Sequence, residues 1–195
     1  MQVELGRVAD VQIGYQVAGK VRPRSDDTHL LVQTVDVSGS GSINWEGLSP
    51  FAPDRKIGDR YTLVDGDVLF LAKGPRRVAA VVRRPRPHTL AVSTFFILRV
   101  RAEAVILPEY LAWFLNVAAQ EQIEAMEHRT TSMAFVPKEA LEKLVVDLPP
   151  TATQQRIVRL NGTMQHERRL TLELLDHRAR LVSAVAKRAM TSEKE

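Results

Sequence analysis

Apolar and polar residues follow different periods along this chain, and the change of period divides it in two. Before residue 150, short apolar runs bounded by glycine, proline and charged residues predict four strands, at 29–37, 68–72, 78–82 and 90–100. Helical spacing predicts a helix from Pro108 to Met126 and a short one from Pro137 to Leu144, followed by a strand at 145–148. The expected class is therefore α+β, a β-rich domain with a packed helix.

The last quarter of the chain has the pattern of one long helix. The pair Pro149 and Pro150 cannot continue a strand ladder, Thr153 is suited to cap a helix, and no proline follows. A helix from Gln154 to about Met190 would be on the order of 50 Å long. We therefore expect a folded domain at 1–150 and a long helix at 151–195.

The apolar positions of this helix recur at alternating steps of three and four, which is typical of a coiled coil. Glu167, Thr171 and Arg178 interrupt this seam with polar side chains. Packing of the helix on its own domain is the alternative, but its length favours a partner helix. The predicted dimer contacts are Ile157, Leu160, Met164, Leu174, Leu181 and Val185.

Positive charge is concentrated in one segment, although the net charge of the chain is only +4. Between Asp67 and Glu103 there is no acidic residue, and the basic residues in this interval are Lys73, Arg76, Arg77, Arg83, Arg84, Arg86, Arg99 and Arg101. Such a local excess of charge is typical of a phosphate-binding surface. The alternatives are a solvated basic loop, or arginines that pair with carboxylates from elsewhere in the fold.

Two loops at strand ends carry most of this charge. A loop that is anchored by strands can be rigid enough to bind the surface of a partner molecule. We predict that these loops form one phosphate-binding face. Its candidate residues are Lys73, Arg76, Arg77, Arg83, Arg84 and Arg86, with the hydroxyl groups of Thr130, Thr131 and Ser132 as further donors.

Catalytic and metal sites are not indicated. The chain has no cysteine, and its five histidines show no metal-ligand spacing. The run Ser38–Ser42 lacks the glycine or lysine pattern of a nucleotide loop and reads as a turn. Asp65 and Asp67 are explained by a turn, and Asp147–Thr151 has the wrong residue order for an adenine methyltransferase motif. We expect a non-enzymatic protein without cofactors.

The chain also lacks the patterns that would send it to or through a membrane. Its first residues have neither a basic segment nor a long apolar run, and no window is apolar enough to span a bilayer. The expectation is a cytoplasmic protein without a membrane partner.

Six segments carry a family resemblance, in order and over nearly the whole chain: Leu5–Val11 with Gly14, Tyr61–Gly74, Phe96–Arg99, Pro108–Asn116, Leu144–Pro150 and Gln154–Ile157. Together they resemble one half of the specificity subunit of type I restriction-modification systems, a target recognition domain followed by a helix. The chain departs from the family at Pro75–Arg77, where a second glycine is common, and at Thr153, where an acidic residue is common.

The resemblance implies a non-catalytic subunit that reads half of a split double-stranded DNA target. It also implies that the predicted phosphate-binding face is a DNA-binding site. Its helix would dock a DNA adenine methyltransferase subunit, and a restriction or translocase subunit is a further partner of such complexes. The family chain has two copies of these segments and this one has a single copy, so we expect a half-length form that pairs as a homodimer through the helix. The alternative is a dimeric coiled-coil scaffold or regulator with only nonspecific DNA affinity.

Overall fold

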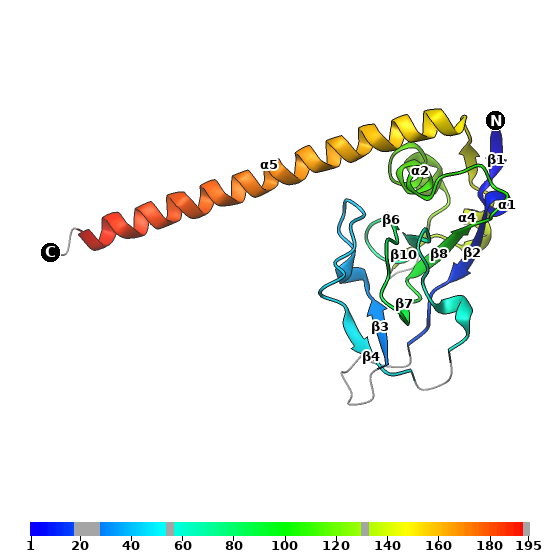
Figure 1. The fold of residues 1–195 in the computed structure, drawn as a ribbon, viewed down its shortest axis with the longest axis horizontal. Coiled ribbons are helices and arrows are strands. Elements are labelled where there is room, and N and C mark those ends of the chain that lie inside the picture. Colours follow the sequence, from blue (N-terminus) through cyan, green and yellow to red (C-terminus); the bar gives the residue numbers. More distant parts are fainter. Residues whose placement is uncertain (18–27, 54–56, 130–132, 193–195) are drawn as a thin grey trace. The chain divides into compact units, whose positions relative to one another are not determined.

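The computed structural model describes residues 1–17, 28–53, 57–129 and 133–192 (Figure 1). Contacts within the chain divide it into two units, Met1–Gln155 and Arg156–Glu195. Among the described residues, no helix combines the length and the apolar character that crossing a membrane would need.

The core of the first unit is a four-stranded antiparallel sheet with the order β2-β8-β5-β6. Its strands are β2 (Ala9–Ile13), β8 (Phe95–Val100), β5 (Val68–Leu71) and β6 (Ala79–Val81). Every residue of β5 is buried, which explains why this strand reads as a continuous apolar run. Phe70 and Phe95 are among the largest fully buried side chains of the domain.

A smaller three-stranded sheet has the order β4-β3-β7, with β3 (His29–Val32) antiparallel to β4 (Ser49–Phe51) and parallel to β7 (Thr89–Ala91). Tyr15, Leu31, Phe51 and Leu90 form its buried cluster. The rings of Tyr15 and Phe51 meet edge to face, with 5.6 Å between their centroids.

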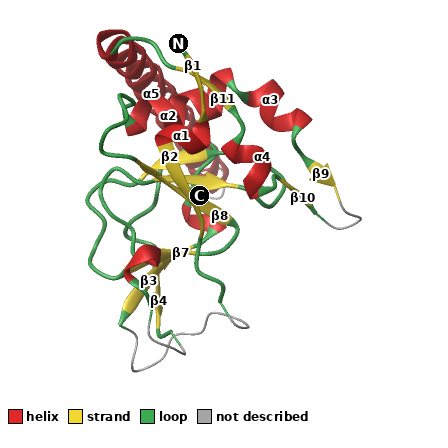
Figure 2. Ribbon diagram, turned by 90° about the vertical axis from the view of Figure 1, so that its right-hand side faces the viewer, coloured by secondary structure: helices red, strands yellow, loops and turns green. Residues whose placement is uncertain are grey.

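Several short elements lie beside the four-stranded sheet (Figure 2). Strand β1 (Gln2–Glu4) pairs with β11 (Val145–Asp147), so the two ends of this unit lie side by side. The remaining short elements are α1 (Leu5–Val8), η2 (Asp59–Tyr61), α4 (Lys138–Glu142) and a hairpin of β9 (His128–Arg129) and β10 (Ala134–Phe135).

The strands predicted at 29–37 and 90–100 are shorter or divided in the structure. After β3 the chain turns into the 3-10 helix η1 (Thr34–Asp36), because the Asp36 carboxylate accepts the Gln33 backbone N–H at 2.7 Å. The second segment forms β7 and β8, which belong to different sheets. The turn between them is closed by a hydrogen bond from Phe95 N to Val92 O.

The helix predicted from Pro108 to Met126 is also interrupted. It consists of α2 (Pro108–Trp113), the π-helical turn η3 (Phe114–Ala118) and α3 (Gln120–Ala125). In η3 the side chain of Asn116 bonds both backbone groups of Ala79, accepting from its N–H at 2.7 Å and donating to its carbonyl at 2.8 Å. Asn116 therefore provides hydrogen-bond partners for backbone groups at the edge of β6, as a neighbouring strand would.

The predicted long helix is confirmed as α5 (Thr151–Ser192). It begins two residues before Thr153, because the Pro150 carbonyl accepts hydrogen bonds from the N–H groups of Thr153 and Gln154. Thr153 is thus inside the first turn, and the prediction that it caps the helix is wrong. The α+β prediction, a β-rich domain with packed helices followed by one long C-terminal helix, is confirmed.

Candidate nucleic-acid interface

The two basic loops leave opposite ends of β6. Residues 72–78 connect β5 to β6, whereas residues 82–88 lead from the other end of β6 to β7. The first loop lies beside the hairpin of β9 and β10, since Gly74 N donates to Ala134 O at 3.1 Å. The structure therefore separates the predicted arginines into two groups with different neighbours.

Arg77 of the first loop is a buried structural residue. Its side chain is 4% exposed, and its Nε lies 3.0 Å from a carboxylate oxygen of Glu127, next to β9. Its Nη1 also donates to Gly74 O at 2.9 Å. We therefore leave Arg77 out of the DNA-binding residues proposed below.

Arg83 of the second loop is paired with carboxylates on two sides. Its guanidinium binds Asp65 at 3.1 Å and also forms an ion pair with Glu109 of α2. The neighbouring Arg84 has a positive φ of 47°, and its backbone N–H donates to Asp65 at 2.6 Å. This hydrogen bond is the main reason why the pKa of Asp65 is lowered; the charge of Arg83, its side-chain hydrogen bond and the charge of Arg84 lower it further.

Acidic residues outside the basic segment neutralise two more arginines. Arg101 pairs with Asp10 at 2.8 Å across β8 and β2. Arg99 pairs with the buried Asp67, and this hydrogen bond is the main reason why the pKa of Arg99 is raised. The alternative interpretation, in which arginines pair with carboxylates from elsewhere in the fold, therefore holds for four residues: Arg77, Arg83, Arg99 and Arg101.

Four basic residues of the two loops form no ion pair with a described carboxylate. Within the described ranges, no carboxylate lies within ion-pair distance of Lys73, Arg76, Arg84 or Arg86. Arg76, Arg84 and Arg86 are exposed, and Lys73 is half-buried. The Arg76 guanidinium donates to two backbone carbonyls, those of Val37 at 2.5 Å and Thr34 at 3.2 Å.

The predicted hydroxyl donors Thr130, Thr131 and Ser132 lie outside the described residues. Strands β9 and β10 flank them on either side. No group of three or more histidine or acidic side chains that could hold a metal occurs in the part of the chain that the structure describes.

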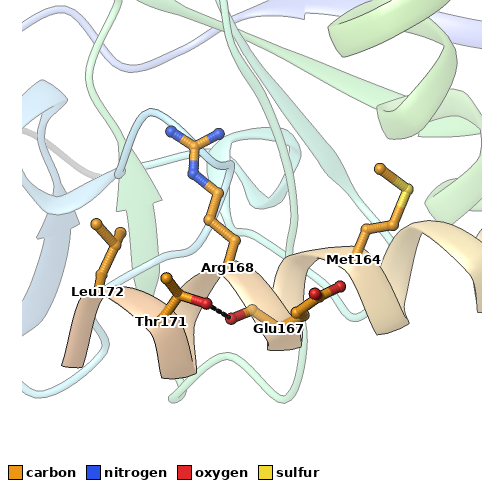
Figure 3. Close-up of a pocket in the computed structure, with 5 residues that line it drawn as sticks. All are labelled: Met164, Glu167, Arg168, Thr171 and Leu172. Carbon is orange, nitrogen blue, oxygen red and sulfur yellow. Dashed lines mark hydrogen bonds between the residues drawn. The ribbon is translucent and has the colours of Figure 1, made fainter. Parts of the chain in front are cut away.

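The predicted seam residues of α5 differ in exposure. Ile157 is half-buried, whereas Leu160, Met164, Leu174, Leu181 and Val185 are all at least half exposed, with values from 50% to 65%. Figure 3 shows a shallow groove on this helix, lined by Met164, Glu167, Arg168, Thr171 and Leu172. A second groove beside it is lined by Thr163, His166, Glu167, Leu170, Thr171 and Leu174. Such grooves between successive turns are the holes into which knobs of a facing helix insert.

The fold is that of specificity subunits of type I restriction-modification systems, and the resemblance read from the sequence is confirmed at this level. The crystal structure of the HsdS subunit from Thermoanaerobacter tengcongensis matches 87% of this chain with a TM-score of 0.61 and 22% identity. A structure from a study of complex assembly and conformational transition of the type I system matches 86%, with a TM-score of 0.61 and 19% identity. The type I S subunit from M. genitalium matches 85%, with a TM-score of 0.57 and 12% identity.

The chain spans about two-fifths of the length of these structures, namely 43%, 38% and 39% of them in the same order. No protein-family model matches the sequence. No curated protein matches it either.

Proposed function

We propose that this chain is the sequence-specific DNA-recognition subunit of a type I-like restriction-modification complex and reads one half of a bipartite target. The observation that carries the proposal is the specificity-subunit fold over 85–87% of the chain. The proposed subunit is non-catalytic. Its role is to position a DNA adenine methyltransferase subunit, with a restriction or translocase subunit as a further partner.

Phosphate contacts are assigned to the four basic residues whose side chains form no ion pair with a described carboxylate, Lys73, Arg76, Arg84 and Arg86. Thr130, Thr131 and Ser132 remain predicted donors to the backbone or bases. A charge that is already neutralised within the fold releases fewer counterions on binding DNA, so Arg83 contributes less than Arg84 and Arg86.

A homodimer through α5 is the second part of the proposal. Two copies would present two recognition domains and therefore a symmetric, split target. The exposed apolar residues of α5 and the grooves between them support pairing with another helix.

The experiment is a selection from random duplex DNA with the purified chain, followed by titration of the enriched duplex at several salt concentrations. Enrichment of a split, symmetric motif is the expected result. In the double variant Arg84→Ala/Arg86→Ala, the slope of log affinity against log salt should become shallower by about 0.9 for each phosphate that the protein no longer neutralises. Arg101→Ala, which removes an arginine paired with Asp10, is the matched control and should leave the slope nearly unchanged.

Binding of all duplexes with equal, low affinity would contradict the proposal. That outcome would favour the alternative, a dimeric scaffold or regulator that has only nonspecific affinity for DNA.

A further inference from the structure

We propose that the loop Gln33–Asn44, called here the 33–44 loop, supplies base contacts, and that Arg76 acts as the residue that positions it. The inference rests on the proposed function, since it names a reading surface within a DNA-recognition domain. None of the loop residues belongs to the basic segment from which DNA contacts were predicted.

The 33–44 loop is held by its own hydrogen bonds. Ser38 N donates to Ser42 O at 2.9 Å, and Gly41 N donates to Ser38 O at 3.1 Å. Below this tip, Val37 and Ile43 form an isolated β-bridge, and Asn44 N donates to Asp36 O at 2.8 Å. A loop built in this way presents its side chains in a fixed arrangement, as recognition of base edges requires.

Gly41 seats the tip of the loop against the edge strand β6. Its φ is +81°, and a Cβ at this position would lie 2.4 Å from the Ala79 carbonyl oxygen. The same oxygen accepts the hydrogen bond from Asn116. Only glycine allows this approach, so the loop is fixed to the same sheet that carries the basic segment 73–77.

Arg76 ties the base of the loop to that basic segment. Its Nη2 donates to Thr34 O and Val37 O, the carbonyls that flank the pair Val35 and Asp36. Carbonyls satisfy the donors of a guanidinium without cancelling its charge, and the Asp36 carboxylate is buried and bonded to Gln33 N. The loop therefore has a fixed positive charge at its base, where a phosphate would approach.

The exposed side chains of the loop are of the types that contact base edges in DNA. Val35 is 86% exposed, and Ser38, Ser40, Ser42 and Asn44 are also exposed. Serine and asparagine side chains both donate and accept hydrogen bonds, and an aliphatic side chain can contact a thymine methyl group. The only acidic residue between Val35 and Asn44 is the buried Asp36, so no exposed carboxylate on this stretch repels the DNA backbone.

The test compares the motifs enriched from random duplex DNA by the full-length wild type and by the variant Val35→Ala/Ser40→Ala/Ser42→Ala. These side chains are exposed, and so is the 2.9 Å hydrogen bond between the Ser40 and Ser38 hydroxyls that the variant loses, so the variant should keep the thermal stability of the wild type. Ser183→Ala, at an exposed serine of α5, is the control for the serine-to-alanine change. We expect the triple variant to lose preference at one or more adjacent base pairs, on the order of tenfold at each, with the salt slope unchanged.

The outcomes separate this inference from the proposed function. If the triple variant enriches the same motif as the wild type, the 33–44 loop does not read bases, and the proposed function stands. If the wild type itself enriches no motif, the proposed function fails and this inference fails with it.

The positioning role of Arg76 is tested by the pair Arg76→Lys and Arg76→Ala. Lysine keeps the charge but cannot reproduce the planar guanidinium that reaches both carbonyls, so it should weaken discrimination at the same base pairs while retaining the salt slope. Alanine should weaken discrimination and also make the slope shallower by about 0.9. Unaltered discrimination in both variants would overturn the positioning role, even if either variant melts at a lower temperature.

Discussion

Arg99 holds Asp67 through a two-pronged ion pair, with Nε 2.8 Å from Oδ1 and Nη2 2.7 Å from Oδ2. The Asp67 residue is 1% exposed, and its Oδ2 also accepts the backbone N–H of Val64, which closes the turn before β5. The pair therefore joins this turn to β8, and it explains why an acidic residue stands directly before a buried apolar strand.

Removing one partner of this pair should destabilise the domain strongly. Asp67→Ala leaves the Arg99 guanidinium and the Val64 N–H without their acceptor, and we expect the free energy of unfolding to fall by about 2–4 kcal/mol. Urea denaturation measures this change. Asp10→Ala, which breaks the exposed pair with Arg101, should cost about 0–1 kcal/mol. Equal losses in the two variants would contradict the argument from burial.

Gln154 offers a second test of a buried polar group. Its amide oxygen accepts Leu107 N at 2.9 Å, and its amide nitrogen donates to Val105 O at 2.8 Å and Pro149 O at 2.9 Å. Gln154→Ala removes partners from all three backbone groups, so a loss of about 2–3 kcal/mol is expected in the same assay. The neighbouring exposed Gln155 is the matched control, and Gln155→Ala should change stability by less than about 0.5 kcal/mol.

The fold class, the buried strand β5 and the long helix were predictable because each depends on local periodicity. Which arginines form ion pairs was not predictable, because their partners are distant in sequence. Glu127 lies 50 positions after Arg77, and Glu109 lies 26 positions after Arg83. The break in the helix after Trp113 has the same origin, because the bonds from Asn116 to Ala79 are tertiary contacts. For the same reason the sequence predicted only a turn at Ser38–Ser42, although Arg76 binds the Val37 carbonyl directly before it.

The paired histidines His29 and His88 should make stability depend on pH near neutrality. Their ring centroids are 5.3 Å apart, and Thr28 Oγ1 lies 2.8 Å from His29 Nδ1. Burial, and to a lesser extent the charge of His88, lower the pKa of His29 below its ordinary value of 6.5. The unfolded chain therefore takes up a proton more readily than the folded one. The contribution of His29 is fully present above pH 6.5, and it is lost as the pH falls from there through the lowered pKa of the folded chain.

Melting temperatures at pH 7.5 and pH 5.5 measure this effect in a range above the titration of ordinary carboxyl groups. The wild type should lose stability between the two values, and His29→Gln should lose less. His166→Gln, at an exposed histidine of α5, should behave as the wild type. If His29→Gln loses as much stability between the two pH values as the wild type, another group causes the pH dependence.

The polar residues within the seam of α5 favour an antiparallel homodimer. In a parallel pair in register, Glu167 would face Glu167 and Arg178 would face Arg178, which places like charges in contact. In an antiparallel pair with its two-fold axis beside Leu172 and Glu173, Glu167 faces Arg178 of the second copy. The apolar positions then also face one another, Met164 with Leu181 and Leu160 with Val185.

Because the chain has no cysteine, single-cysteine variants can distinguish these two arrangements. The two variants Leu160→Cys and Val185→Cys are mixed so that their subunits exchange, and the mixture is then oxidised. A cross-linked dimer should form that neither variant forms alone. Arg159→Cys is an exposed control that should not cross-link with either. Cross-linking of Leu160→Cys with itself would instead indicate a parallel pair.

Light scattering gives an independent measure of the dimer. Glu167→Arg should weaken the dimer, because two arginines then face each other. Adding Arg178→Glu in the same chain should restore the dimer, because the charge pair is then reversed. A chain that remains monomeric at all concentrations would contradict the homodimer itself.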